Sequence, residues 1–225
     1  MKIAIIFGLL GAALLGAAAQ AATPNDVVVR GNKVYFVGKR GSQDSALGKY
    51  EPNRLCPGQV YHRWPYPHCT GYGQYWPYAG YAISGKLSIQ GQYFALAEGF
   101  VASANAKANE VQVAVSWTHG TNAVNVGLYN DAGGLPGTVL AQQQATGLPS
   151  FGSCCDSVTV TFKHKVALEA GAQYWIVVTP GADDTAAAWN MDVSDQVHPA
   201  LLAQDGGSGW SLINGLPGVA AMVGK

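Results

Sequence analysis

The sequence has few charged residues. Only 12% of its 225 residues are Asp, Glu, Lys or Arg, and the 13 basic residues balance the 13 acidic ones. This is about half of the usual charged share. Nucleic-acid binding needs a basic stripe, and attraction to anionic membranes needs clustered cations. The composition therefore argues against both, whereas low charge with 29 glycines is typical of an exported β protein rich in turns.

The sequence also lacks the motifs of common active sites. It contains no Gly-x-Ser-x-Gly elbow, no His-Glu-x-x-His motif and no Asp-x-Asp-x-Asp array. Most acidic residues stand beside Gly, Asn or Ser, where a short carboxylate can bond the backbone of a turn. Asp131, ahead of Gly133-Gly134, is one such residue. We therefore expect no enzyme activity, no catalytic residues, no metal and no cofactor, although calcium binding by loop carboxylates at Asp183-Asp184, or at Asp192 with Asp195, stays open.

One long apolar run is present, at the N-terminus. Lys2 precedes the apolar stretch 3–15, and Ala19-Gln20-Ala21 is a small-x-small cleavage site. This pattern predicts a signal peptide over residues 1–21 and a mature chain that is secreted or periplasmic. The alternative is a retained membrane anchor, but the run is short for a span. The end of the chain has no apolar tail, which favours free secretion or periplasmic retention over surface anchoring.

Cysteine is scarce. In an exported chain its four cysteines, Cys56, Cys69, Cys154 and Cys155, are disulfide candidates. A Cys56–Cys69 bridge would close a short loop and would contribute about 3 kcal/mol in the chain-entropy model. Cys154 and Cys155 are adjacent, so a bridge between them would be strained. Their state stays open: a strained bridge, a buried thiol pair or bridges to other cysteines.

Helical periodicity is poor, and period-2 alternation takes its place. A hairpin is predicted over 27–37, with Gly31-Asn32 as its turn. The short stretch 102–109 is the one candidate for a turn of helix. Further strands are predicted over 86–94, 111–117, 123–129, 158–162, 174–179, 186–191 and in 212–223.

Many short strands separated by turn signals predict an all-β fold. We expect an antiparallel β-sandwich, jelly-roll or immunoglobulin-like, over residues 83–225. Residues 22–82 would precede it as an N-terminal hairpin and an irregular arm rich in Tyr, Trp and Pro.

The arm is the main candidate for a ligand-binding site. Exposed Trp and Tyr rings stack on the apolar faces of sugars, and they are also enriched in the cores of protein interfaces. The alternative is that the rings fold back and cap one end of the sandwich. The candidate residues are Trp64, Tyr72, Tyr75, Trp76, Tyr78 and Tyr81.

Several motifs occur in an order that resembles a known family. They are Tyr129-Asn-Asp-x-Gly-Gly-x-Pro-Gly137, Cys154-Cys155, Leu168-x-Ala-Gly-x-x-Tyr-Trp175, Trp189 and Gly209-Trp210, followed by a closing strand. In this order they resemble the "choice-of-anchor" β-sandwich domain of exported bacterial proteins, over about residues 94–225. The resemblance implies a sandwich fold and an extracellular location, and it implies no enzyme activity.

Together these features predict an exported, non-enzymatic bacterial module that binds or assembles at or outside the cell envelope. Its partner would be a polysaccharide or another envelope protein. We expect no nucleic-acid partner and no membrane contact after signal cleavage. The alternative is a carbohydrate-binding module that uses the aromatic residues at 64–81. A self-assembling structural protein is a further rival, and the oligomeric state is open.

Overall fold

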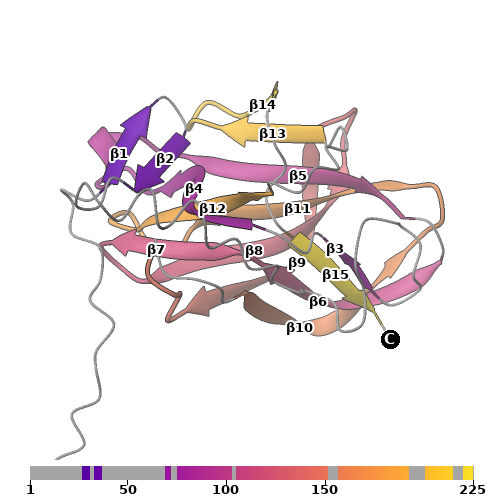
Figure 1. Cartoon of the computed structure of the whole chain (residues 1–225). Coiled ribbons are helices and arrows are strands. Elements are labelled where there is room, and N and C mark those ends of the chain that lie inside the picture. Colours follow the sequence, from indigo (N-terminus) through magenta and orange to yellow (C-terminus); the bar gives the residue numbers. More distant parts are fainter. Residues whose placement is uncertain are drawn as a thin grey trace, which may run out of the picture.

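The chain folds into antiparallel β-sheets that pack together. The computed structural model describes residues 27–30, 33–36, 69–71, 75–102, 105–151, 157–192, 201–214 and 220–224. Within these ranges every pairing between two strands is antiparallel. This confirms the all-β prediction (Figure 1). The described ranges contain no helix that is long and apolar enough to span a bilayer.

The largest sheet has six strands, in the order β14-β13-β5-β11-β8-β9. β11 is central, as its run of apolar residues on both faces predicts. The strands are β5 (Ala95–Val101), β8 (Ala123–Asp131), β9 (Pro136–Thr146), β11 (Gln173–Pro180), β13 (Leu201–Asp205) and β14 (Trp210–Ile213).

A five-stranded sheet has the order β1-β2-β4-β12-β7, and a four-stranded sheet has the order β10-β6-β15-β3. The five-stranded sheet consists of β1 (Val27–Arg30), β2 (Lys33–Phe36), β4 (Tyr75–Ser84), β7 (Val115–His119) and β12 (Ala186–Asp192). The four-stranded sheet consists of β3 (Cys69–Gly71), β6 (Ala106–Val113), β10 (Val158–Leu168) and β15 (Ala220–Gly224).

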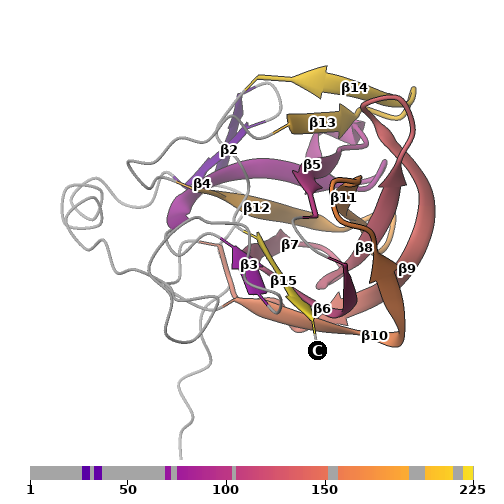
Figure 2. The same cartoon turned by 90° about the vertical axis from the view of Figure 1, so that its right-hand side faces the viewer.

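The two smaller sheets are joined by continuous chain. β6 belongs to the four-stranded sheet and β7 to the five-stranded sheet, and Ala114 alone separates them. The carbonyl of Ala114 accepts a hydrogen bond from the N–H of Asn190 in β12 (2.8 Å), which holds the junction in place. The chain thus passes from one sheet into the other, and both pack with the six-stranded sheet (Figure 2).

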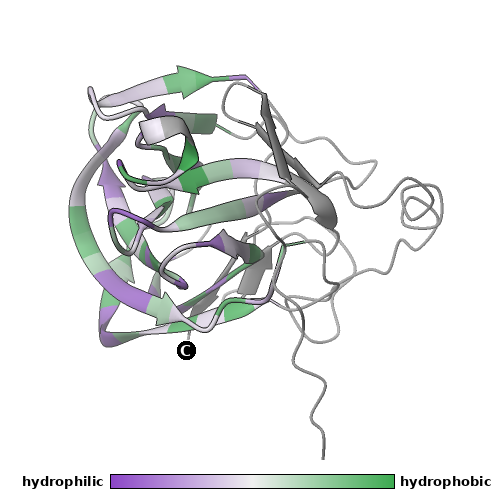
Figure 3. Ribbon diagram, turned by 90° about the vertical axis from the view of Figure 1, so that its left-hand side faces the viewer, coloured by the Kyte–Doolittle hydropathy of each residue, from purple (hydrophilic) through white to green (hydrophobic). Residues whose placement is uncertain are grey.

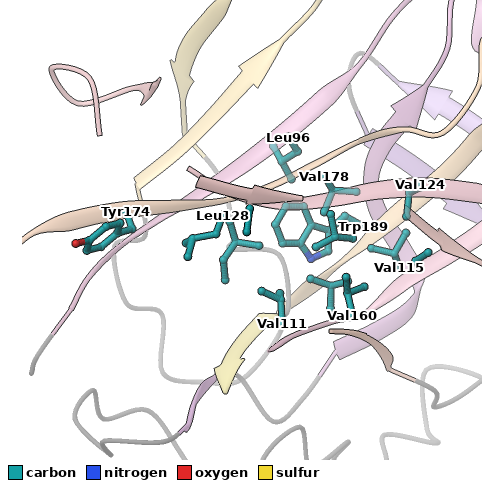
Figure 4. Close-up of a cluster of buried hydrophobic side chains, with 14 of the residues drawn as sticks. Leu96, Val111, Val115, Val124, Leu128, Val160, Tyr174, Val178 and Trp189 are labelled. Carbon is teal, nitrogen blue, oxygen red and sulfur yellow. The ribbon is translucent and has the colours of Figure 1, made fainter. Parts of the chain in front are cut away.

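All three sheets contribute side chains to one shared core. Trp189 of β12 is fully buried, and valines from several strands surround its indole (Figure 4). Val111, Val113 and Val115 lie on one face of β6 and β7, as their spacing predicts. Hydrophobic and hydrophilic residues are interspersed along the strands, so each sheet has one face toward the core (Figure 3).

The structure confirms the predicted hairpin, because β1 pairs with β2 across residues 31 and 32. Two predictions of local structure are wrong. The stretch 86–94 is a turn with a short 3-10 helix, Ile89–Gly91, because most of its backbone bonds are local or go to the 183–185 turn, and only Phe94 bridges to a strand, at Ser84 of β4. Residues 106–109 lie in β6 and do not form a helical turn.

The predicted irregular arm is wrong for residues 69–71, which form β3, and for residues 75–81, which belong to β4. Pro77 lies where the pairing of β4 with β12 shifts register, between the Gly80–Asn190 and Tyr75–Asp192 pairs. Such an irregularity accommodates a residue without an N–H. The boundary predicted between residues 82 and 83 falls inside β4.

Candidate functional site

The six-stranded sheet has a second apolar face. In β11, Tyr174, Ile176 and Val178 contribute to the shared core, while Trp175 and Val177 point to the opposite side. Successive side chains of a strand alternate between the two faces. We call the side of this sheet that points away from the shared core the outer face.

The strand register aligns the outer-face residues in rows across the sheet. The first row holds Leu201, Gly99, Trp175, Tyr129 and Val139. The second row holds Leu212, Ala203, Ala97, Val177, Gly127 and Gln142. The third row holds Trp210, Asp205, Ala95, Thr179, Asn125 and Gln144. The middle row is built mainly of small residues, and larger ones flank it.

The outer face concentrates the exposed hydrophobic residues of the described chain. Leu212 is 57% exposed, Val101 51%, and Leu201 and Val139 43% each. All four lie on the outer face by their register. The fifth large exposed hydrophobic, Leu87, lies in the turn before the 3-10 helix. Because exposed apolar side chains that gather on one face often mark an interaction site, this face is the strongest candidate among the described residues.

Two glycines of the outer face allow aromatic rings to lie along the strands. A Cβ atom at Gly127 would come within 2.7 Å of the Tyr129 Cε2 atom. A Cβ atom at Gly99 would come within 3.2 Å of the Trp175 ring. The Trp175 indole is fully buried, whereas Tyr129 is half-buried. The outer face therefore has a small apolar cluster of its own, covered in part by Tyr129, Leu135 and Trp210.

Asp131 joins two motifs that are far apart in the sequence. Its Oδ1 atom accepts hydrogen bonds from Trp175 Nε1 and Gln173 Nε2, both at 2.8 Å. Its Oδ2 atom accepts the backbone N–H of Gly134 at 2.9 Å. The carboxylate thus holds its own turn, as predicted, and also satisfies the buried indole of the second motif.

Local geometry explains why glycine occupies three positions of the first motif. Gly133 and Gly134 have φ values of 69° and 86°, in the left-handed region that favours glycine. A Cβ atom at Gly137 would come within 2.6 Å of Asn130 Oδ1. In the second motif, the Tyr174 hydroxyl accepts the backbone N–H of Glu169 at 2.9 Å. Both motifs therefore serve the scaffold.

The strands of the six-stranded sheet offer few charged side chains on the outer face. Asp205 bonds its own turn, because its Oδ1 accepts the N–H groups of Gly207 (2.7 Å) and Gly209 (3.0 Å). The strands of this sheet contain one acidic residue besides Asp131 and Asp205. It is Glu98, which is buried and points toward the shared core. No lysine or arginine occurs in the strands of this sheet, all of which lie in the described chain.

Two tyrosines of this face have raised pKa values. Burial raises the pKa of the Tyr129 phenol above 10.0. Burial also raises the pKa of Tyr93, and the negative charge of Asp205 and the Tyr129 phenolate add to this effect. Both phenols therefore stay neutral hydrogen-bond donors throughout the physiological pH range.

A separate polar cluster lies at one end of the sandwich. The Thr185 hydroxyl contacts the carbonyls of Thr121 and Ala123, both at 3.1 Å. Burial lowers the pKa of nearby His119, and the charge of Asp184 partly offsets this shift. These bonds connect two turns to each other, so we assign this cluster to the scaffold.

The predicted aromatic site is only partly within the described chain. Trp64 and Tyr72 lie outside the described residues. Tyr75, Trp76 and Tyr78 belong to β4, but their side chains lie outside the description. Tyr81 is 1% exposed and packs in the shared core. The prediction of an exposed ring is therefore wrong for Tyr81, and it stays a prediction for the other five.

The disulfide predictions also fall largely outside the described chain. Cys56, Cys154 and Cys155 lie outside the described residues, and Cys69 begins β3, where only the backbone is described. Their pairing stays a prediction. Within the described ranges, no three His, Cys, Asp or Glu side chains come together in a group that could hold a metal ion.

Sequence reasoning missed most of the outer face. Pro136 and Gly137 are typical of a turn, yet they begin β9, which carries Val139, Gln142 and Gln144. The alternation Asn125, Gly127, Tyr129 was available as a signal. The opposite set, Val124, Val126 and Leu128, gives the stronger signal, because its residues are uniformly apolar.

No protein-family model matches the chain, and no curated protein matches it either.

Proposed function

We propose that the protein is an exported, non-enzymatic bacterial module that binds or assembles at or outside the cell envelope, and that it does so through the outer face. The observation that carries the proposal is the concentration of exposed hydrophobic side chains there. Four of the five in the described chain, Val101, Val139, Leu201 and Leu212, lie on this one face. A surface depleted in charge and enriched in apolar and aromatic groups resembles the core of an interaction site.

The bonds of the acidic residues support a non-enzymatic role. A catalytic carboxylate must be available to substrate. Asp131 instead accepts three internal hydrogen bonds, and Asp205 accepts two from its own turn. Both carboxylates of the outer face are therefore engaged in structural contacts.

We also propose an immunoglobulin-like or jelly-roll topology and a relationship to the choice-of-anchor sandwiches. The Tyr174 hydroxyl, which accepts a backbone N–H five residues upstream, resembles the tyrosine corner of immunoglobulin-like domains. The linkage of the two motifs through Asp131 gives a physical reason for their joint occurrence.

The test is cosedimentation of the purified mature chain with a bacterial cell-envelope preparation. We expect the wild type to sediment with the envelope and the double variant Leu201→Ser/Leu212→Ser to remain in the supernatant. Leu87→Ser is the control, because it removes an even more exposed leucine elsewhere, and it should bind like the wild type. Equal binding by all three proteins would overturn the proposal, as would hydrolase activity that is lost on mutation of a carboxylate pair.

A further inference from the structure

The half of the outer face formed by β8 and β9 differs from the apolar half formed by β13 and β14. Besides the exposed Val139, it carries one aromatic ring, Tyr129, and the uncharged amides Asn125, Gln142 and Gln144. We infer that this half binds an uncharged polysaccharide, with the Tyr129 ring as the stacking surface and the amides as partners of the sugar hydroxyls. This inference rests on the proposed function, because it concerns the same outer face, and it adds a ligand for the half formed by β8 and β9.

The first argument is the orientation of the ring. Residues 127 and 129 point to the same side of β8, and Gly127, which has no side chain, leaves room for the Tyr129 ring. The Tyr129 Cε2 and Cδ2 atoms lie 2.7 and 3.4 Å from where a Cβ of residue 127 would be. The ring therefore lies along the strand and is half-buried. A ring in this position presents a face to a ligand, and the apolar face of a sugar stacks on such a surface.

The second argument is the arrangement of the amides. Gln142 is opposite Gly127, over which the ring lies, and Gln144 is opposite Asn125 in the next row of the same face. The Asn125 Nδ2 atom donates to the carbonyl of Pro180 (3.0 Å), and the Gln144 Nε2 atom donates to that of Gly181 (3.3 Å). These two bonds orient the Asn125 and Gln144 side chains through their amide nitrogens. Among the described residues none donates to their amide oxygens, which can accept hydroxyl protons.

The third argument is charge. A polyanion would need lysine or arginine, which the strands of this sheet lack. A polycation would need available carboxylates, but Asp131 and Asp205 are held by internal bonds. The phenols of Tyr93 and Tyr129 remain protonated at neutral pH. An uncharged polymer rich in hydroxyl groups is the ligand that this chemistry matches.

The experiment is affinity electrophoresis of the mature chain in gels that contain hydroxyethyl cellulose, laminarin, xylan or soluble starch. We expect at least one polymer to retard the wild type, equally at pH 7 and pH 9. The variant Gln142→Ala/Gln144→Ala changes two exposed positions and keeps the fold. It should weaken binding about tenfold, or about 1.4 kcal/mol. Tyr129→Phe should bind within about twofold of the wild type, Tyr129→Ala should lose retardation, and Leu87→Ser should be unchanged.

Three outcomes would overturn the inference. One is no retardation by any of the four polymers. Another is equal retardation of the wild type and the Gln142→Ala/Gln144→Ala variant. The third is a dimer in sedimentation velocity that this variant disrupts, which would make a second copy the occupant of the face. If envelope cosedimentation still depends on Leu201 and Leu212, the proposed function survives and only the polysaccharide inference fails.

Discussion

The removal of the Asp131 carboxylate is the sharpest test of how the two motifs stabilise the fold. Asp131→Ala deletes the acceptor of the Trp175 indole N–H, the Gln173 amide and the Gly134 backbone N–H. Trp175 is fully buried, so its donor cannot turn to water without movement of the ring. An unsatisfied buried donor costs about 1–3 kcal/mol.

The other two donors contribute less. The Gln173 side chain and the Gly134 turn lie near the surface, where water can replace the carboxylate, so each loss costs about 0.5–1 kcal/mol. The free energy of unfolding should therefore fall by about 3 kcal/mol in Asp131→Ala. Asp131→Asn retains an oxygen for Trp175 and loses mainly the bond to Gly134, so it should cost about 1 kcal/mol.

The measurement is urea unfolding followed by far-UV circular dichroism, which does not depend on the fluorescence of Trp175. Asp205→Ala is the matched control, because Asp205 accepts two backbone N–H groups in an exposed turn but no buried indole. It should cost about 1 kcal/mol. In a double-mutant cycle, Asp131→Ala should lower the free energy of unfolding by at least about 1 kcal/mol less in a Trp175→Phe background than in the wild type. A cost for Asp131→Ala no larger than that for Asp205→Ala would refute the reasoning.

Three further predictions concern the ends of the sandwich. Tyr174→Phe removes the acceptor of the Glu169 N–H and should lower the free energy of unfolding in urea by about 1 kcal/mol; an unchanged midpoint would contradict this. Burial lowers the pKa of His119 below 6.5, so the folded state binds this proton less readily than the unfolded state. The stability that this group contributes is therefore complete above pH 6.5 and is lost as the pH falls through the lowered pKa. In that pH window, the thermal midpoint of His119→Asn should depend less on pH than the midpoint of the wild type. A Cβ atom at Gly120, where φ is +72°, would overlap the backbone carbonyl of Asp184, so Gly120→Ala should cost about 2 kcal/mol or more in the same urea assay, and a loss below about 0.5 kcal/mol would refute the contact.

The strands that the sequence predicts best are those with one uniformly apolar side. Val124, Val126 and Leu128 alternate with smaller or polar residues, and the structure places all three in the shared core. The central position of β11 also follows from its composition, since Trp175 and Val177 need cover on the side opposite to Ile176. Local alternation carries this information directly.

The outer face could not be predicted in the same way. Its apolar cluster brings together Ala97, Trp175 and Ala203, from strands that are distant in the sequence. No local pattern reports which strands become neighbours, because pairing depends on the whole topology. The error at 86–94 has the same origin, since its backbone bonds to the distant 183–185 turn.

The position of β5 affects when the chain can fold. β5 comes early in the sequence, but both of its partners, β11 and β13, come late. A polypeptide that emerges N-terminus first therefore carries β5 with both hydrogen-bonding edges open until nearly all of the chain has appeared. Pairing between such distant segments is slow because a long loop must close first. The six-stranded sheet can therefore form around β5 only after β11 and β13 have been synthesised.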